Sequence, residues 1–144
     1  MKTIERTCAI AYSINLLGDK WSLLILRDVL MHKKTRFKEF IDSKEKIASN
    51  ILANRLKFLV EEGFLELLDP DGFKKNKQYI GTDRALAALP IIMELYLFSI
   101  HSIKESVLNA SQINIKKEIL SDRKGFEEGT KENYLNFVRK LKNS

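Results

Sequence analysis

The sequence has few of the residues that cross-link or interrupt a chain: one cysteine, two prolines and six glycines among 144 residues. Cys8 has no second cysteine to pair with inside the chain, so a disulfide-stapled secreted scaffold is excluded. The first residues lack a long apolar run followed by a small-residue cleavage site. We therefore expect no signal peptide and a cytoplasmic location.

Long hydrophobic runs and catalytic motifs are also absent. Residues 86–103 are rich in apolar side chains, but Pro90, Glu94 and His101 interrupt them, which favours a buried helix over a membrane span. There is no glycine-rich phosphate loop, HExxH motif or GxSxG motif, so we do not expect an enzyme. His32 and His101 are isolated in the sequence, and no metal or other cofactor is expected.

What the chain does have is a globular composition with an excess of positive charge. Hydrophobic residues make up 44% and charged residues 31%, which is typical of one folded domain with its own core. Lysine and arginine total 25 against 19 acidic residues, for a net charge of +6. This balance favours a polyanionic partner, either nucleic acid or an anionic membrane surface.

Residues 47–63, IASNILANRLKFLVEEG, have the pattern of a helix with two different faces. Apolar residues recur at helical spacing and form one stripe: Ile51, Leu52, Leu56, Leu59 and Val60. The other face carries small residues, amides and one cation: Ser49, Asn50, Ala53, Asn54 and Lys57. Asparagine pairs bidentately with adenine, serine permits close approach, and lysine meets phosphate. A polar helix face is more commonly just solvated, so the neighbouring segments decide between the two roles.

These segments give the order helix, helix, helix, hairpin. We predict helices over residues 8–17, 20–31 and 37–43, a very short strand at Arg36-Phe37, and strands over 64–68 and 78–80. The stretch from Asp69 to Gly72 is a strong turn signal, and three lysines follow it. The order predicts a mainly α winged helix-turn-helix, with residues 47–62 as the recognition helix and residues 69–80 as the wing.

A long helix is predicted after the wing, from Ala85 to Leu108, with Pro90 bending it or starting its main segment. It is apolar nearly all round, so we expect one face to pack on its own domain and another on a second subunit. The candidates for this dimer contact are Ile92, Leu95, Tyr96, Phe98 and Ile100. Two short tail helices, near 113–120 and 130–141, are expected around a loop at Gly125 to Gly129. The predicted division is a domain over 1–110, including the dimer helix, and a helical extension over 111–144.

Several motifs, in order, resemble the HxlR family of winged-helix regulators. Gly18 to Asp28, GDKWSLLILRD, is similar to the family's GGKWTLLILRDL signature. Arg36-Phe37 with Glu39 matches RFxEL, and Tyr79 with Thr82 resembles the YxLT that closes the wing. The recognition-helix pattern LxxRLxxLxxxG is matched by Leu52, Arg55-Leu56, Leu59 and Glu62-Gly63. The similarity covers about residues 5 to 108. The chain departs from the family at Ala53, at Lys44 to Lys46 in place of Leu-Pro-Gly, and at Ile80-Gly81 and Ala85 around the wing.

The resemblance implies a homodimeric transcription factor whose N- and C-terminal helices form the dimer and which binds a pseudo-palindromic operator on double-stranded DNA. Its two recognition helices would enter major grooves about one turn, roughly 34 Å, apart. The candidate base readers are Ser49, Asn50 and Asn54. The candidate phosphate contacts are Arg36, Arg55, Lys57 and, on the wing, Lys74, Lys75 and Lys77. Arg55 has an alternative role as a structural bridge to Glu39 or Glu62.

The resemblance also suggests that Cys8 senses oxidants or electrophiles, as this cysteine does in some members of the family. A position at a helix N-terminus near Arg6 would lower the thiol pKa. The alternative is that Cys8 is a buried small hydrophobe. An unknown small-molecule effector is a further expected partner. The competing function is a winged-helix module that binds another protein or binds DNA without sequence preference.

Overall fold

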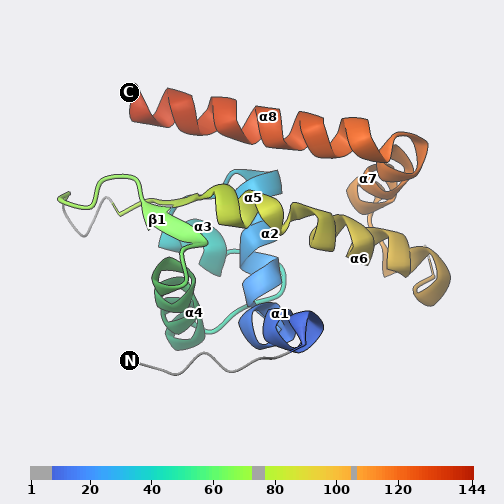
Figure 1. The fold of residues 1–144 in the computed structure, drawn as a ribbon, viewed down its shortest axis with the longest axis horizontal. Helices are drawn as coiled ribbons and strands as arrows, with labels where there is room; N and C mark the ends of the chain where they lie inside the picture. The colour runs from blue at the N-terminus through green and yellow to red at the C-terminus, as the bar shows by residue number, and fades with distance from the viewer. Residues whose placement is uncertain (1–7, 73–76, 105–106) are drawn as a thin grey trace.

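The computed structural model describes residues 8–72, 77–104 and 107–144 (Figure 1). Its helices and strands, in chain order, are α1 (Ala9–Leu17), α2 (Ser22–His32), α3 (Phe37–Ile41), α4 (Ser49–Glu61), β1 (Leu65–Leu67), β2 (Tyr79–Gly81), α5 (Asp83–Ala87), α6 (Leu89–Ser102), α7 (Ala110–Ser121) and α8 (Arg123–Lys142). The strands β1 and β2 are antiparallel, with Glu66 opposite Ile80. The predicted fold class, mainly helical with a small hairpin wing, is confirmed.

Local sequence signals set several of the helix ends. Asp19 Oδ2 accepts hydrogen bonds from the backbone N–H of Trp21 and of Ser22, both at 3.0 Å, and so starts α2. Thr82 caps α5 by accepting from the Ala85 N–H. Gly63 ends α4 with φ +78, a conformation that glycine adopts without steric cost.

One core cluster takes in the buried sides of both α2 and α4. Its fully buried members on these two helices are Leu26, Val29, Leu30, Leu52, Leu56 and Leu59. Burying a side chain of this size contributes about 1.5–3 kcal/mol. Ile51, a member of the predicted apolar stripe, is partly exposed, and so is Phe37 at the start of α3. On the same helices, Phe40 and Leu52 are the buried residues.

The predicted strand at Arg36-Phe37 is wrong, because Phe37 already begins α3. The strand-like contact lies one position earlier: the Tyr79 N–H donates to the Thr35 carbonyl at 2.8 Å. The long helix predicted after the wing takes the form in which Pro90 starts its main segment. It is divided into α5 and α6, with Pro90 in the first turn of α6. Proline has no N–H to donate to the carbonyl four residues before it, so the helical hydrogen bonding is interrupted there and the break falls at Ala88, between α5 and α6.

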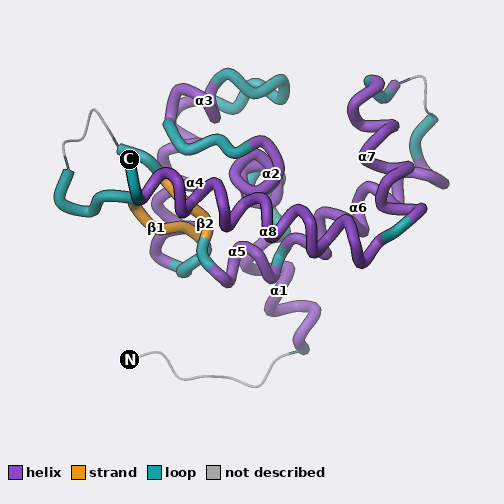
Figure 2. The backbone as a smooth tube through the Cα atoms, turned by 90° about the horizontal axis from the view of Figure 1, so that it is seen from above, coloured by secondary structure: helices purple, strands orange, loops and turns teal. Residues whose placement is uncertain are grey.

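The tail differs most from the expectation. Gly125 and Gly129 lie inside α8, a continuous helix of 20 residues, and not in a loop. Asp122 caps this helix by accepting from the Gly125 N–H at 2.9 Å. Tyr134 is fully buried in the common core. Its Oη accepts from the backbone N–H of Gly81 at 2.7 Å and ties α8 to β2. Figures 1 and 2 show α8 crossing the molecule from α7 toward the wing.

Candidate DNA-binding surface

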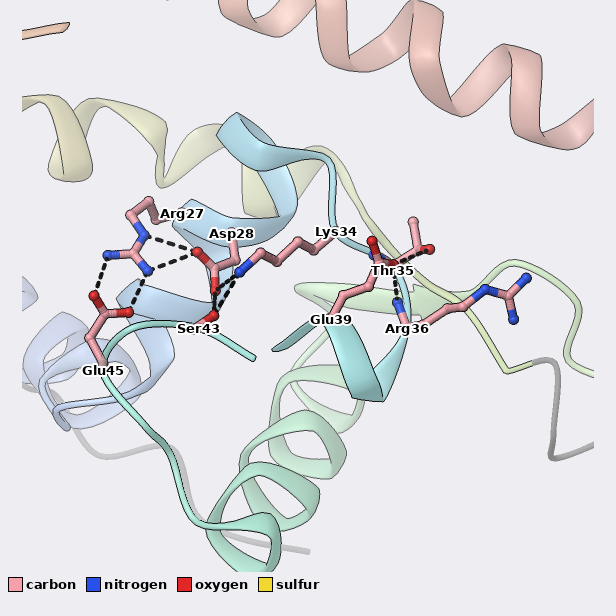
Figure 3. Close-up of polar contacts among 8 residues, drawn as sticks. All are labelled: Arg27, Asp28, Lys34, Thr35, Arg36, Glu39, Ser43 and Glu45. Atoms are coloured by element: carbon pink, nitrogen blue, oxygen red, sulfur yellow. Dashed lines mark hydrogen bonds and ion pairs between the residues drawn. The ribbon is translucent and has the colours of Figure 1, made fainter. Parts of the chain in front are cut away.

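A buried polar network fixes the turn that leads into α4 (Figure 3). Asp28 is 3% exposed. Its Oδ2 accepts from Ser43 Oγ at 2.5 Å and lies 3.3 Å from Lys34 Nζ, and Oδ1 lies 2.8 Å from Arg27 Nη2. Arg27 Nη2 also lies 2.7 Å from Glu45 Oε1, and this bond is the main reason that the pKa of Glu45 is lowered. The network therefore joins the second helix to both ends of the 43–45 turn.

A second cluster in Figure 3 sets the start of α3. Glu39 Oε1 accepts from the backbone N–H of Thr35 at 3.1 Å and of Arg36 at 3.0 Å. Partial burial by itself raises the pKa of Glu39, but these N–H donors outweigh it and lower the pKa. With Glu39 in place, the Arg36 side chain lies on the exposed side of α3.

The five residues expected on the reading face of α4 all lie on its exposed surface: Ser49, Asn50, Ala53, Asn54 and Lys57. Opposite them, Leu52, Leu56 and Leu59 hold the helix to the core. Because the helix is anchored along one side, its amide-bearing side is presented as a rigid, convex surface that suits the width of a DNA major groove.

Beside this face lies a groove of about 950 Å³ between α3, α4 and the wing. Its charged lining consists of four cations and one carboxylate: Arg36, Lys38, Lys57, Lys77 and Glu61. The structure thus brings three of the predicted phosphate contacts together. Lys38 was missed by the sequence reasoning, although it follows Arg36 by two residues in a short basic stretch. Lys74 and Lys75 lie outside the described residues.

Arg55 takes the structural alternative of bridging an acid, but the acid is Asp19 and not Glu39 or Glu62. Its Nη1 lies 3.5 Å from Asp19 Oδ1, and its guanidinium lies 4.5 Å from the Phe58 ring centroid. The acids expected to bridge it have other partners, since Glu62 lies 3.9 Å from Arg84 and Glu39 caps α3. Arg55 thus links α4 to the cap of α2, and with its side chain 26% exposed it is less accessible to a phosphate than the exposed Lys57.

The predicted dimer residues divide into two groups. Ile92 is 4% exposed, so it belongs to the chain's own core and is not available to a partner. Leu95 is 51% and Phe98 67% exposed, whereas Tyr96 is half-buried against the core. The side chain of Ile100 lies outside the described residues. Two apolar side chains of α1, Ile10 and Ile14, are also exposed.

Cys8 lies at the N-cap position of α1 and is exposed, which contradicts the buried alternative. The backbone N–H groups of Ala11 and Ile10 stabilise the thiolate and lower the pKa of Cys8 below its ordinary value.

In the described segments, no helix is long and apolar enough to cross a membrane. Nor do residues 8–72, 77–104 and 107–144 bring three or more His, Cys, Asp or Glu side chains together as a metal site.

The sequence profile of the HxlR-like helix-turn-helix family matches residues 16–107. The chain belongs to this family. It is a DNA-binding helix-turn-helix transcriptional regulator. An uncharacterised HTH-type transcriptional regulator of Halalkalibacterium halodurans, BH0655, is 30% identical over 95 residues, covering 66% of this chain and 83% of the relative.

Solved structures have the same arrangement. PA1607, a candidate transcription factor, superposes with a TM-score of 0.61 and 32% identity, covering 69% of this chain and 68% of that one. The reduced form of the transcriptional regulator YodB from B. subtilis gives a TM-score of 0.53 and 26% identity, covering 69% of this chain and 97% of YodB. The quinone-bound form of YodB gives a TM-score of 0.52 and 28% identity, covering 65% of this chain and 97% of YodB. The family match stops before α7 and α8.

Proposed function

We propose that this HxlR-like regulator acts in the cytoplasm as a homodimer that reads a pseudo-palindromic operator with α4. The observation that carries the proposal is the carboxylate-free α4 surface from Ser49 to Lys57, next to a groove with four cations. Asn50 and Asn54 are the proposed base readers, with Ser49 permitting close approach. Arg36, Lys57 and the wing lysines Lys74, Lys75 and Lys77 are the proposed phosphate contacts, with a smaller share from Arg55.

The testing experiment is selection of bound fragments from random duplex DNA. We expect an enriched two-fold-symmetric site for the unaltered chain and its loss in Asn50→Ala/Asn54→Ala. A well-placed bidentate pair is worth about 1–3 kcal/mol of discrimination. The matched control is Asn114→Ala/Asn133→Ala, which removes two exposed helical asparagines from the extension. Salt-sensitive binding without enrichment would favour the architectural alternative, and no DNA binding would favour the protein-interaction alternative.

Dimerisation is proposed through the outer faces of α1 and α6. Ile10 and Ile14 of α1 and Ile91 of α6 line an apolar groove of about 370 Å³ together with Leu23 of α2. Farther along α6, Leu95 and Phe98 are exposed. Sedimentation at micromolar concentration should give a dimer, and Phe98→Glu should give a monomer. Leu120→Glu, at an exposed leucine on α7, is the matched control and should remain dimeric. A monomeric unaltered chain would remove the two-half-site mechanism.

We further propose that Cys8 makes DNA binding sensitive to oxidants or electrophiles. The exposed thiol and its lowered pKa support this, and the related YodB has been solved in reduced, diamide-treated and quinone-bound forms. With a single cysteine in the chain, oxidation would join two subunits or add a small thiol. Cys8→Ser should bind DNA normally but lose its response to diamide and quinone. A response that persists in Cys8→Ser would end the redox proposal and leave a small-molecule effector as the alternative.

For the division of the chain, we keep the proposal made from the sequence. Residues 1–110 form the DNA-binding and dimerisation domain, and residues 111–144 form a helical extension.

A further inference from the structure

The helical extension adds a group of cations beside the wing. The first half of α8, residues 123–133, has three cations and three carboxylates. Residues 134–142 have three cations and no carboxylate: Arg139, Lys140 and Lys142. All the carboxylates of α8 therefore lie toward α7, and its unbalanced positive charge lies at the opposite end.

The structure fixes where this positive end lies. Tyr134 is fully buried and bonded to Gly81 at 2.7 Å, so the first residue of the basic half sits on the base of the wing. Lys33 Nζ lies 5.9 Å from the Phe137 ring centroid, which holds the next turn against the end of α2. Figures 1 and 2, viewed at right angles, both place the C-terminal end of α8 on the same side of the molecule as the wing.

Gly81 shows that the wing and the extension are fitted to each other. A Cβ at this position would lie 3.3 Å from both Leu30 Cδ2 and Ala85 Cβ and 3.4 Å from Tyr134 Oη, so a longer side chain would have little room beside Tyr134. The YxLT pattern that closes the wing in the HxlR family has leucine here. The chain thus departs from the family pattern at the place where its own extension docks.

The three cations are exposed, and no ion pair of the described residues involves them. In the first half of α8, by contrast, Arg123 pairs with Glu94 and Lys131 lies 3.4 Å from Glu127. Cations at a helix C-terminus are favoured by the helix dipole, but that alone does not require the end of the helix to lie next to a DNA-binding wing.

We propose that Arg139, Lys140 and Lys142 bind backbone phosphates of DNA that flanks the operator, outside the segment read by α4. This inference rests on the proposed function, because it extends the same protein–DNA complex. It assigns the extension a direct role in affinity and none in base recognition, since phosphate contacts carry no sequence information.

The test compares Arg139→Gln/Lys140→Gln/Lys142→Gln with Lys104→Gln/Lys117→Gln/Lys124→Gln, a control that removes the same charge from exposed lysines near α7. Binding is measured against salt, on the selected operator with long flanks and with flanks trimmed to its edges. Each lost phosphate contact lowers the salt slope by about 0.9, so losing three per protomer lowers the slope of a dimer by about five. We expect that loss, together with loss of flank dependence, in the first variant and neither change in the control.

Equal effects of the two variants, an unchanged slope, or a flank dependence that survives in the first variant would overturn the inference while leaving the proposed function intact. If the unaltered chain binds no duplex, the proposed function itself fails. A second measurement avoids any folding defect: amine acetylation of the unaltered chain with and without operator. Lys140 and Lys142 should be protected by DNA, and Lys117 and Lys124 should not. Equal labelling of both pairs with and without DNA would count against the proposal.

Discussion

The polar network around Asp28 gives the sharpest stability prediction. Deleting one member of a fully buried ion pair lowers the free energy of unfolding by about 3–5 kcal/mol, because the other charge stays buried without a partner. Here the side chains of Arg27 and Lys34 are 17% and 22% exposed, and Arg27 keeps Glu45 as a second partner. We therefore expect Asp28→Ala to lower the free energy of unfolding by about 2–3 kcal/mol, less than the full penalty. At about 3 °C per kcal/mol for a chain of this size, the melting temperature should fall by about 6–9 °C.

The assay is urea unfolding at neutral pH, followed by circular dichroism. Ser43→Ala should cost about 1–1.5 kcal/mol, because it removes one donor to the same carboxylate. Asp28→Ala/Ser43→Ala should cost about 1 kcal/mol less than the sum of the two single changes, since their side chains are in contact. Asp42→Ala, an exposed acid next to Ser43, is the matched control and should stay within about 0.5 kcal/mol. A loss below about 0.5 kcal/mol for Asp28→Ala, or strict additivity with Ser43→Ala, would refute the reasoning.

Three further changes test separate features. Lys46 has φ +57 without being glycine, so Lys46→Gly should raise the free energy of unfolding by about 0.5–1 kcal/mol in the same urea assay. Tyr134→Phe leaves the Gly81 N–H without its acceptor and should cost about 1–2 kcal/mol, with faster hydrogen exchange at Gly81. The bond to Arg27 lowers the pKa of Glu45 below its ordinary value of 4.5. The ionised Glu45 side chain therefore stabilises the fold at pH values above 4.5, and this contribution is lost as the pH falls through the pKa of the folded state. The melting temperatures of the unaltered chain and Glu45→Gln should therefore converge between about pH 5 and pH 3.

Matched changes define what would contradict these expectations. Lys57→Gly, in the middle of α4, should lower stability by about 1 kcal/mol, and a similar loss in Lys46→Gly would show that Lys46 is unstrained. Tyr12→Phe, at an exposed tyrosine, should have almost no effect, and an equally small effect of Tyr134→Phe would mean that its hydroxyl is dispensable. If the difference in melting temperature between the unaltered chain and Glu45→Gln stays constant down to about pH 3, the ion pair of Glu45 is not the cause of that difference.

Features that depend on near neighbours in the sequence could be predicted. Asp19 precedes the helix it caps by three residues, and Gly63 follows the helix it ends. Both signals are local and do not need the fold. The apolar spacing of Leu52, Leu56 and Leu59 likewise fixes which side of α4 is buried, and therefore which side carries Asn50 and Asn54.

Features that depend on contacts between distant segments could not be predicted from the sequence. Asp28 and Ser43 meet only because the 43–45 turn folds back onto α2, and nothing in their spacing shows it. The glycines at 125 and 129 were read as a loop, since each costs a helix about 1 kcal/mol. That cost is outweighed by the Asp122 cap and by the burial of Tyr134 against a wing that lies 53 positions away.

The position of α8 also sets how far this protein can be shortened. The family match ends at residue 107, before α7 and α8 begin. A chain cut there would lose Ile119 and Tyr134 from the common core and would leave the Gly81 N–H at the base of the wing open to solvent. Its wing would be freer than in the 144-residue chain, and weak DNA binding by such a fragment would report the missing support and not the reading face of α4.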